Sequence, residues 1–194
     1  MKILAFVDMH GDLSALIELK KKAKKADIIV CAGDLTIFEN DIDYFLLELN
    51  SIGKPVLMIH GNHESLADLK NLCEPLENLT FIHKKLHKFQ DFIFVGYGGG
   101  GFSITDPAFE NFFNKNKSQL NENVVLVTHA PPYGTKLDKL DSEYYGNKSI
   151  MKFIKRFQPR VAVGGHFHEN SGAVQEIGKT LAINPGPDGM IIEV

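Results

Sequence analysis

The feature that most constrains this chain is a repeated pairing of a short apolar run with polar side chains directly after it. The runs are rich in valine and isoleucine and span residues 3–7, 28–30, 56–59, 124–127 and 161–163. Their length and composition are typical of buried β-strands. Parallel strands that end at one edge of a sheet bring side chains together from distant parts of a sequence. The pattern therefore predicts an α/β fold with one functional site at the strand ends.

The polar residues near the ends of these runs include two carboxylates, one amide and four imidazoles. These candidate metal ligands are Asp8, His10, Asp34, Asn62, His129, His166 and His168. Oxygen and imidazole donors suit first-row divalent cations, and seven of them can hold two ions. A single carboxylate can also bridge a pair of cations. We therefore expect a centre with two divalent metals.

The spacing of two motifs supports this expectation. Asp8 and His10 lie two residues apart, as do His166 and His168. Side chains at i and i+2 point to the same side of an extended chain, so each pair can reach one ion. Taken alone, each motif also fits a polar loop, and Asp34 alone fits a turn. The joint occurrence of all five blocks favours the metal site.

The segment 61–64, Gly-Asn-His-Glu, is the most specific block. Its asparagine offers a neutral oxygen ligand. The adjacent His63 can stand close to the metals without binding them, and a titratable imidazole there suits general acid catalysis. The alternative is an N-cap role for Asn62 and an ordinary loop position for His63. We predict His63 as the catalytic acid.

Helical periodicity alternates with the apolar runs in the first half of the chain, and strand-like runs dominate the second half. Helices are expected at 13–25, 40–50, 64–73, 108–120 and 148–157. The first helix is expected to be amphipathic, with Leu13, Leu16, Ile17 and Lys20 at helical spacing and Asp12 as its N-cap. Runs within 80–95 suggest antiparallel strands. A length of 194 residues fits one domain, 1–194.

Composition excludes several classes of protein. The net charge of −3 gives no broad attraction for nucleic acid or acidic membranes, so neither is an expected partner. No apolar stretch approaches membrane-spanning length, and the first seven residues already read as a core strand rather than a signal peptide. Cys31 and Cys73 show no paired spacing, which suits buried thiols in a reducing cytoplasm. The oligomeric state is left open.

The order Asp-x-His, Gly-Asp, Gly-Asn-His-Glu, His and Gly-His-x-His resembles the calcineurin-like metallophosphoesterase superfamily, and its small single-domain prokaryotic members in particular. The resemblance runs from Asp8 to His168. It implies a four-layer α/β/β/α sandwich with two mixed sheets and outer helices. It also implies that Asp34 bridges the two ions and that His63 is the catalytic histidine. The implied ligands are Asp8, His10 and His168 for one metal and Asn62, His129 and His166 for the other.

The resemblance further implies a dimetal phosphoesterase acting on small phosphate esters, with phosphodiesterase activity favoured over monoesterase activity. A hydroxide that bridges the metals would attack phosphorus, and His63 would protonate the leaving oxygen. Manganese is the first choice of metal, with iron, zinc or nickel as alternatives. The carboxylate and arginine that follow Gly-Asp in the family's protein phosphatases are missing after Asp34, which argues against that activity. The competing hypothesis is a catalytically silent metal-binding scaffold, as in the retromer subunit of the superfamily.

A glycine-rich loop, Gly98–Gly101, lies where related proteins have a loop near the site. Glycines permit close backbone approach to a ligand, although a mobile turn is an equal alternative. Phe102, Tyr97 and Tyr133 are candidates for stacking on a base or an aromatic ester. Outside the site, His60 is expected to be structural, and the remaining histidines, at 83 and 87, are expected to be exposed.

Overall fold

Two β-sheets pack face to face in the computed structural model, which describes residues 1–120 and 123–194. The first sheet has the strand order β13-β1-β2-β3-β4, and the second has the order β11-β12-β10-β7-β6-β5. The first comprises β1 (Lys2–Phe6), β2 (Ile28–Cys31), β3 (Val56–Met58), β4 (Leu79–Phe81) and β13 (Met190–Glu193). The second comprises β5 (Lys85–Phe89), β6 (Phe92–Tyr97), β7 (Val124–Thr128), β10 (Val161–Val163), β11 (Val174–Ile177) and β12 (Thr180–Ile183).

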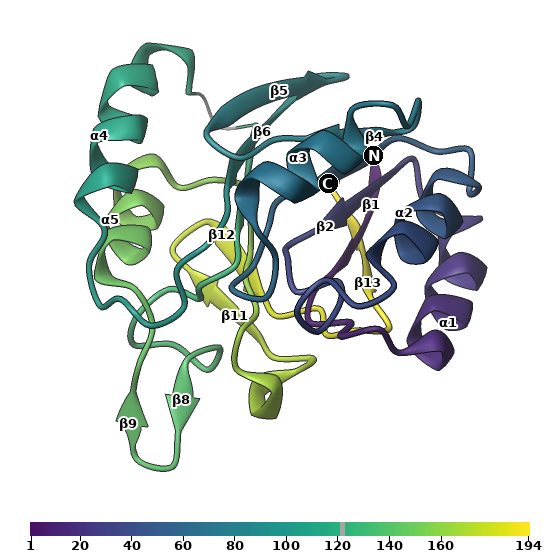
Figure 1. Ribbon diagram of the computed structural model, residues 1–194. Coiled ribbons are helices and arrows are strands. Elements are labelled where there is room, and N and C mark those ends of the chain that lie inside the picture. The colour runs from purple at the N-terminus through teal and green to yellow at the C-terminus, as the bar shows by residue number, and fades with distance from the viewer. Residues whose placement is uncertain (121–122) are drawn as a thin grey trace.

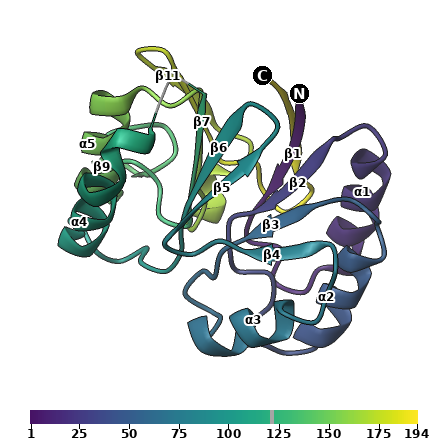
Figure 2. The same ribbon diagram turned by 90° about the horizontal axis from the view of Figure 1, so that it is seen from above.

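Helices cover the outer face of each sheet, as Figures 1 and 2 show. The first sheet is covered by α1 (Leu13–Ala23), α2 (Ile42–Asn50) and α3 (Leu66–Cys73), and the second by α4 (Pro107–Asn116) and α5 (Lys148–Phe157). The smaller elements are η1 (Lys117–Gln119), η2 (His168–Asn170) and a hairpin of β8 (Lys139–Leu140) and β9 (Glu143–Tyr144). These layers confirm the expected α/β/β/α sandwich.

The apolar alternation of β1 shows how the layers are held together. Ile3 and Val7 belong to the core between the two sheets, whereas Leu4 and Phe6 belong to the core beneath the helices of the first sheet. Successive side chains of a strand point to opposite faces, so a strand buried on both sides needs a continuous apolar run. Each fully buried side chain of this size contributes about 1.5–3 kcal/mol. The same reasoning explains the other apolar runs that end at the site.

Parallel pairing sets the position of the strand ends. β1 pairs in parallel with β2, β2 with β3 and β3 with β4, while β7 pairs in parallel with both β6 and β10. The outer strands β13, β5 and β11 pair antiparallel with their neighbours. Both sheets are therefore mixed, as expected. Within each sheet, the parallel strands that precede the polar blocks end at the same edge.

Two expectations for individual elements need correction, and a third is refined. Leu79–Phe81 is not part of an antiparallel group; it forms β4, which extends the first sheet in parallel beside β3. In α1 the buried residues are Ala15, Leu16, Leu19 and Ala23, whereas Leu13 and Ile17 are 54% and 56% exposed. The helix expected over 108–120 ends at Asn116 and continues as the 3₁₀ turn η1. The predicted N-cap Asp12 is confirmed, since its carboxylate accepts hydrogen bonds from the backbone of Ser14 and Ala15.

Candidate metal centre

All seven predicted ligands lie in the segments that follow five strands. Asp8 and His10 follow β1, Asp34 follows β2, and Asn62 follows β3 in the first sheet. In the second sheet, His129 follows β7 directly, and the remaining pair, His166 and His168, follows β10. The side chains meet where these loops from the two sheets face each other, as the contacts below show. The structure therefore brings the seven residues together.

The backbone at these positions is strained. Asp8, His10, Asp34 and His166 have φ values of 56°, 49°, 52° and 72°, in the left-handed region that residues with a Cβ atom rarely adopt. Such conformations persist only where surrounding contacts impose them, and they cluster at functional sites. Here they occur at four of the seven candidate ligands, where the chain turns after a strand.

One cluster combines Asp8, His10 and His168, whose ligating atoms all lie within 4.8 Å of one another. The Nε2 atoms of His10 and His168 are 2.9 Å apart. Oδ2 of Asp8 accepts a hydrogen bond from the backbone of His166, while its Oδ1 is buried and has no hydrogen-bond partner among the described residues. A buried carboxylate oxygen without a partner, beside two imidazole nitrogens, is a fitting environment for a cation.

A second cluster combines Asp34, His129 and His166 within the same 4.8 Å limit. Oδ1 of Asn62 lies 2.9 Å from Nε2 of His129 and 2.9 Å from Nδ1 of His166. Asp34 stands between the clusters, because its Oδ2 is 3.3 Å from Nε2 of His129 and 4.0 Å from Nε2 of His10. Its position is the one a bridging carboxylate needs.

The carbonyl of Ala32 fixes the tautomer of His129. Nδ1 of His129 lies 3.0 Å from this oxygen, and since a carbonyl only accepts, Nδ1 carries the proton. Nε2 is thereby left facing the carboxylate of Asp34 and the amide oxygen of Asn62. Outer hydrogen bonds of this kind orient metal-ligating histidines in proteins.

The electrostatics of the cluster also fit a cation. Burial alone would lower the pKa of His129, but the hydrogen bond that its protonated ring donates to Asp34 and the negative charges of Asp34 and Asp8 raise it overall. Burial opposes the ionisation of Asp34, yet the hydrogen bond and charge of His129 lower the pKa of its carboxyl to about 2. Several lone pairs therefore converge on a place that attracts positive charge. A divalent cation bound there would be stabilised by the same negative charges and lone pairs.

Two further imidazoles of the site are kept in their neutral, ligating form. Burial lowers the pKa of His166 to about 4, with a further contribution from the charge of His129. Burial also lowers the pKa of His10. In contrast, burial raises the pKa of Asp8, a cost that a bound cation would offset.

His63 lies beside the first cluster. Its ring is 4.9 Å from that of His10, and a ring nitrogen lies within 4.8 Å of ligating atoms of His10 and Asp34. Its backbone N–H donates to Oδ1 of Asp34 at 2.9 Å, which couples its position to the carboxylate between the clusters. The imidazole is thus close enough either to bind an ion or to serve a substrate bound there.

Glu64 is a structural support that the sequence did not assign. Its buried carboxylate accepts three backbone hydrogen bonds, from Asp34 at 3.0 Å, Thr36 at 3.2 Å and Gly61 at 2.8 Å. It therefore joins the loop after β2 to the loop after β3. The sequence signal was its place at the end of the Gly-Asn-His-Glu block, but a neighbouring position alone does not reveal which groups a side chain contacts.

The glycine-rich loop packs directly against the site. A Cβ atom on Gly101, where φ is +101°, would lie 2.6 Å from the imidazole of His166, so a side chain is excluded there. The backbone of Gly99 donates to the carbonyl of His60, and that of Gly98 donates to Nδ1 of His83. His83 is therefore not an exposed histidine as expected, but a partly buried support of this loop.

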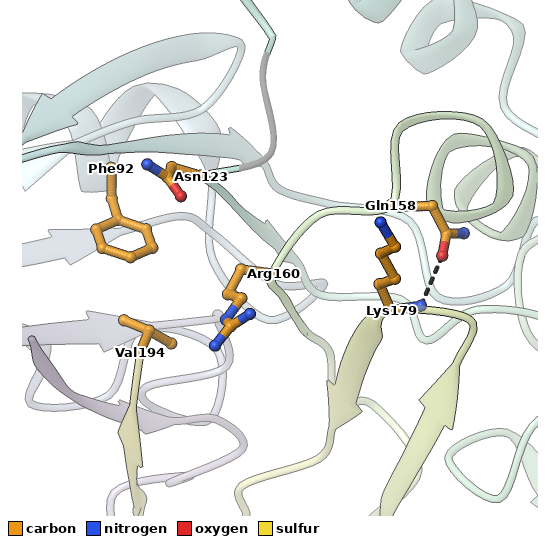
Figure 3. Close-up of a pocket in the computed structure, with 6 residues that line it drawn as sticks. All are labelled: Phe92, Asn123, Gln158, Arg160, Lys179 and Val194. Atoms are coloured by element: carbon orange, nitrogen blue, oxygen red, sulfur yellow. Dashed lines mark hydrogen bonds between the residues drawn. The ribbon is translucent and has the colours of Figure 1, made fainter.

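Two cavities differ in their relation to these residues. A cavity of about 210 Å³ opens beside the first cluster and is lined by Asp8, His168, Ser171, Gly186 and Pro187. A larger one, of about 440 Å³, lies where strands of the second sheet begin, and Figure 3 shows the residues that line it. It is lined by Phe92, Asn123, Gln158, Arg160, Lys179 and Val194. These residues include none of the candidate ligands, whereas the smaller cavity is lined by two of them, Asp8 and His168.

Comparison with known proteins identifies the family of the chain that carries this site. The sequence model of the calcineurin-like phosphoesterases matches residues 1–170. This chain belongs to that family. The match includes all five ligand blocks, and the sandwich described above is the architecture that the resemblance implied.

Among curated relatives, an uncharacterised protein of Methanocaldococcus jannaschii is 34% identical over 99% of this chain and 91% of its own length. A protein of Caenorhabditis elegans from the UPF0046 group is 26% identical over 95% of this chain and 69% of its own length. Neither name states an activity. These two relatives therefore do not specify a substrate.

Solved structures support the fold. A protein of Thermus thermophilus superposes with a TM-score of 0.76 and 19% identity over 96% of this chain and 90% of its own. A dimetal phosphatase from Danio rerio superposes with a TM-score of 0.59 and 12% identity over 94% and 86%. Across the described residues, no helix is both long and apolar enough to cross a membrane.

Proposed function

We propose that this protein is a dimetal-dependent phosphoesterase that hydrolyses small phosphate esters, with phosphodiesters as the favoured class. The observation that carries the proposal is the position of Asp34 between two ligand clusters, each made of side chains from both sheets. Family membership supports the reaction class, because calcineurin-like phosphoesterases act on phosphate esters. The dimetal phosphatase among the structural neighbours has the same fold.

The ligands that we propose for one ion are Asp8, His10 and His168, and those for the other are Asn62, His129 and His166, with Asp34 shared. The mixture of carboxylate, amide and imidazole donors suits manganese, our first choice, and also iron, zinc or nickel. When bound, two such cations would lower the pKa of a water molecule and neutralise charge on the phosphoryl oxygens.

The remaining chemistry falls to side chains of this protein. We assign His63 the role of general acid, which delivers a proton to the leaving oxygen, because it lies beside the clusters and its backbone is held by Asp34. Glu64 and the Ala32 carbonyl orient the residues around it through hydrogen bonds. The cavity beside Asp8 and His168 offers space for part of a substrate.

The proposal also covers the domain, its partner and its location in the cell. We propose that residues 1–194 form one metallophosphoesterase domain whose partner is a small phosphate ester rather than nucleic acid or a membrane. Cys31 and Cys73 are buried free thiols, which supports a location in the reducing cytoplasm.

The test is an assay of manganese-reconstituted protein against a phosphate monoester, a phosphate diester and cyclic nucleotides, with metal content measured in the same samples. We expect two ions per chain and faster hydrolysis of the diester. An Asp34→Asn variant should lose both metal and turnover, whereas an Asp43→Asn variant, altered on the helix α2 away from the ligands, should retain both. Two bound ions without turnover of any ester would instead favour the silent scaffold.

A further inference from the structure

Two phenylalanines differ from the others in their exposure to solvent. All fourteen phenylalanines lie within the described residues, and only Phe38 and Phe102 are exposed, at 73% and 81% of their surface. Both pack against histidines of the candidate centre, since the ring of Phe38 is 4.6 Å from that of His63 and the ring of Phe102 is 4.6 Å from that of His166. Exposed aromatic side chains that gather at a polar site indicate a surface for a ligand.

The loop that carries Phe38 is fixed in an unfavourable conformation. Phe38 and Glu39 have φ values of 48° and 64°, a rare conformation for a bulky aromatic residue. The loop is nevertheless tied down, because the carboxylate of Glu39 accepts a hydrogen bond from the backbone of Ser65 at 2.6 Å. Ile37 beside it is also 45% exposed. The strained loop therefore holds an exposed apolar surface next to His63, as backbone strain at functional sites often does.

The loop that carries Phe102 is anchored at both ends. Gly99 donates to the carbonyl of His60, and the side-chain amide of Asn147 donates to the carbonyl of Ser103 at 2.7 Å. Ile104, which follows, is 53% exposed. Phe102 thus flanks the cluster that contains His166, whereas Phe38 packs on His63, which lies beside the cluster that contains His10.

We infer that Phe38 and Phe102 are specificity-determining residues that select phosphate esters with planar apolar substituents. The inference rests on the proposed function and adds the substrate class. A leaving oxygen within hydrogen-bond reach of His63 places its substituent next to Phe38. Phe102, beside the other cluster, then faces the substituent that stays on phosphorus. Two such surfaces match a diester with an aromatic group on either side.

The leaving side is tested with benzyl phosphate and ethyl phosphate, whose alcohols have similar acidity. Wild-type protein with manganese should prefer the benzyl ester in kcat/KM by about tenfold, the size of one stacking contact. Phe38→Ala should abolish this preference by raising KM for the benzyl ester. Leu47→Ala, which removes an exposed apolar side chain on α2, is the matched control and should keep the preference.

The retained side is tested with diesters that share one leaving group, benzyl p-nitrophenyl phosphate and methyl p-nitrophenyl phosphate. Phe102→Ala should lower the preference for the benzyl compound by about tenfold, and Phe102→Tyr should restore it, because an aromatic face is all that the contact needs. Preferences that are unchanged in both alanine variants would overturn the inference.

Binding separates this inference from the proposed function. Calorimetry compares benzylphosphonate with ethylphosphonate, two stable analogues, on the metal-loaded protein. Tighter binding of the benzyl compound that is lost in Phe38→Ala supports the inference even if no ester is hydrolysed, an outcome that would refute only the phosphoesterase activity. Equal binding of both analogues to wild type would overturn the inference while leaving the activity intact.

Discussion

Oε2 of Glu64 lies 3.0 Å from the backbone nitrogen of Asp34 and accepts its hydrogen bond, so one buried carboxylate sets the position of the other. The same Glu64 carboxylate also binds the backbone of Gly61, two residues before His63. Glu64 therefore couples the position of the loop that carries the proposed bridging ligand to the position of the loop that carries the proposed acid. Burial raises the pKa of Glu64, which is the cost of placing this charge in the interior.

Replacing Glu64 by glutamine should destabilise the fold. The amide has one acceptor oxygen for three backbone donors, and a buried donor left unpaired costs about 1–3 kcal/mol. Urea unfolding at neutral pH measures the change in the free energy of unfolding. Glu193→Gln, which removes an exposed partner of Lys2, is the control and should change it by less than about 1 kcal/mol. Equal effects of the two substitutions would contradict the support role.

His63→Asn should separate metal binding from turnover. If His63 is the general acid, we expect the variant to keep two ions and lose about 10²–10⁴-fold in kcat. Loss of an ion would show instead that His63 is a ligand, which its distance from His10 and Asp34 permits. Elemental analysis and steady-state kinetics on the same preparation make the distinction. His87→Asn, in β5 away from the site, should match wild type.

Asp34→Asn should empty both metal positions rather than one, because the Asp34 carboxylate lies within 4.8 Å of ligand atoms in both clusters, His10 in one and His129 and His166 in the other. The substitution keeps the shape of the side chain and allows its oxygen to accept from the backbone of His63, so the fold should persist. We expect the affinity for both ions to fall by at least about tenfold. Competitive chelation measures this affinity, and retention of one tight site would refute the bridging assignment.

Acid should weaken the protein partly through His83. Burial lowers the pKa of His83 to about 4, from an ordinary value of 6.5. Between these values the unfolded chain takes up a proton that the folded chain excludes, so His83 contributes stability that is present above pH 6.5 and is lost as the pH falls towards 4. Protonation would also end the hydrogen bond that Nδ1 accepts from Gly98.

His83→Asn tests this contribution, because asparagine can still accept from Gly98 but does not titrate. The two proteins should be similarly stable near neutral pH, and the variant should lose less stability than wild type on acidification. Denaturant midpoints across this range provide the measurement. Parallel pH profiles would show that His83 plays no part in acid sensitivity.

The buried strands and the candidate ligand blocks could be predicted from the sequence because both depend on local patterns. A valine-rich run followed by Asp34 or His129 predicts a buried strand and a side chain at its end, whatever the rest of the fold does. The partner of a strand is a long-range property. Leu79–Phe81 has the composition of a strand, but nothing in its residues specifies that it lies parallel to β3.

Exposure was harder to predict than periodicity. Ile17 has helical spacing with Leu13, yet the face of α1 that is buried is centred on Leu16 and Leu19. Phe38 and Phe102 could not be identified as exposed from composition, which favours burial of phenylalanine. Their exposure arises from loop conformations that are fixed by distant hydrogen bonds, such as the one between Glu39 and Ser65. Of the aromatic candidates, Tyr97 proves to be buried.

The left-handed backbone at Asp8, His10, Asp34 and His166 sets a trade-off between durability and chemistry. Glycine would relax each position by about 1–2 kcal/mol, since it alone adopts this conformation freely. Selection for thermal stability alone would therefore favour glycine at these positions and so remove residues that are proposed to hold the ions. Any thermostable variant obtained by chance should be checked first for substitutions at these four positions.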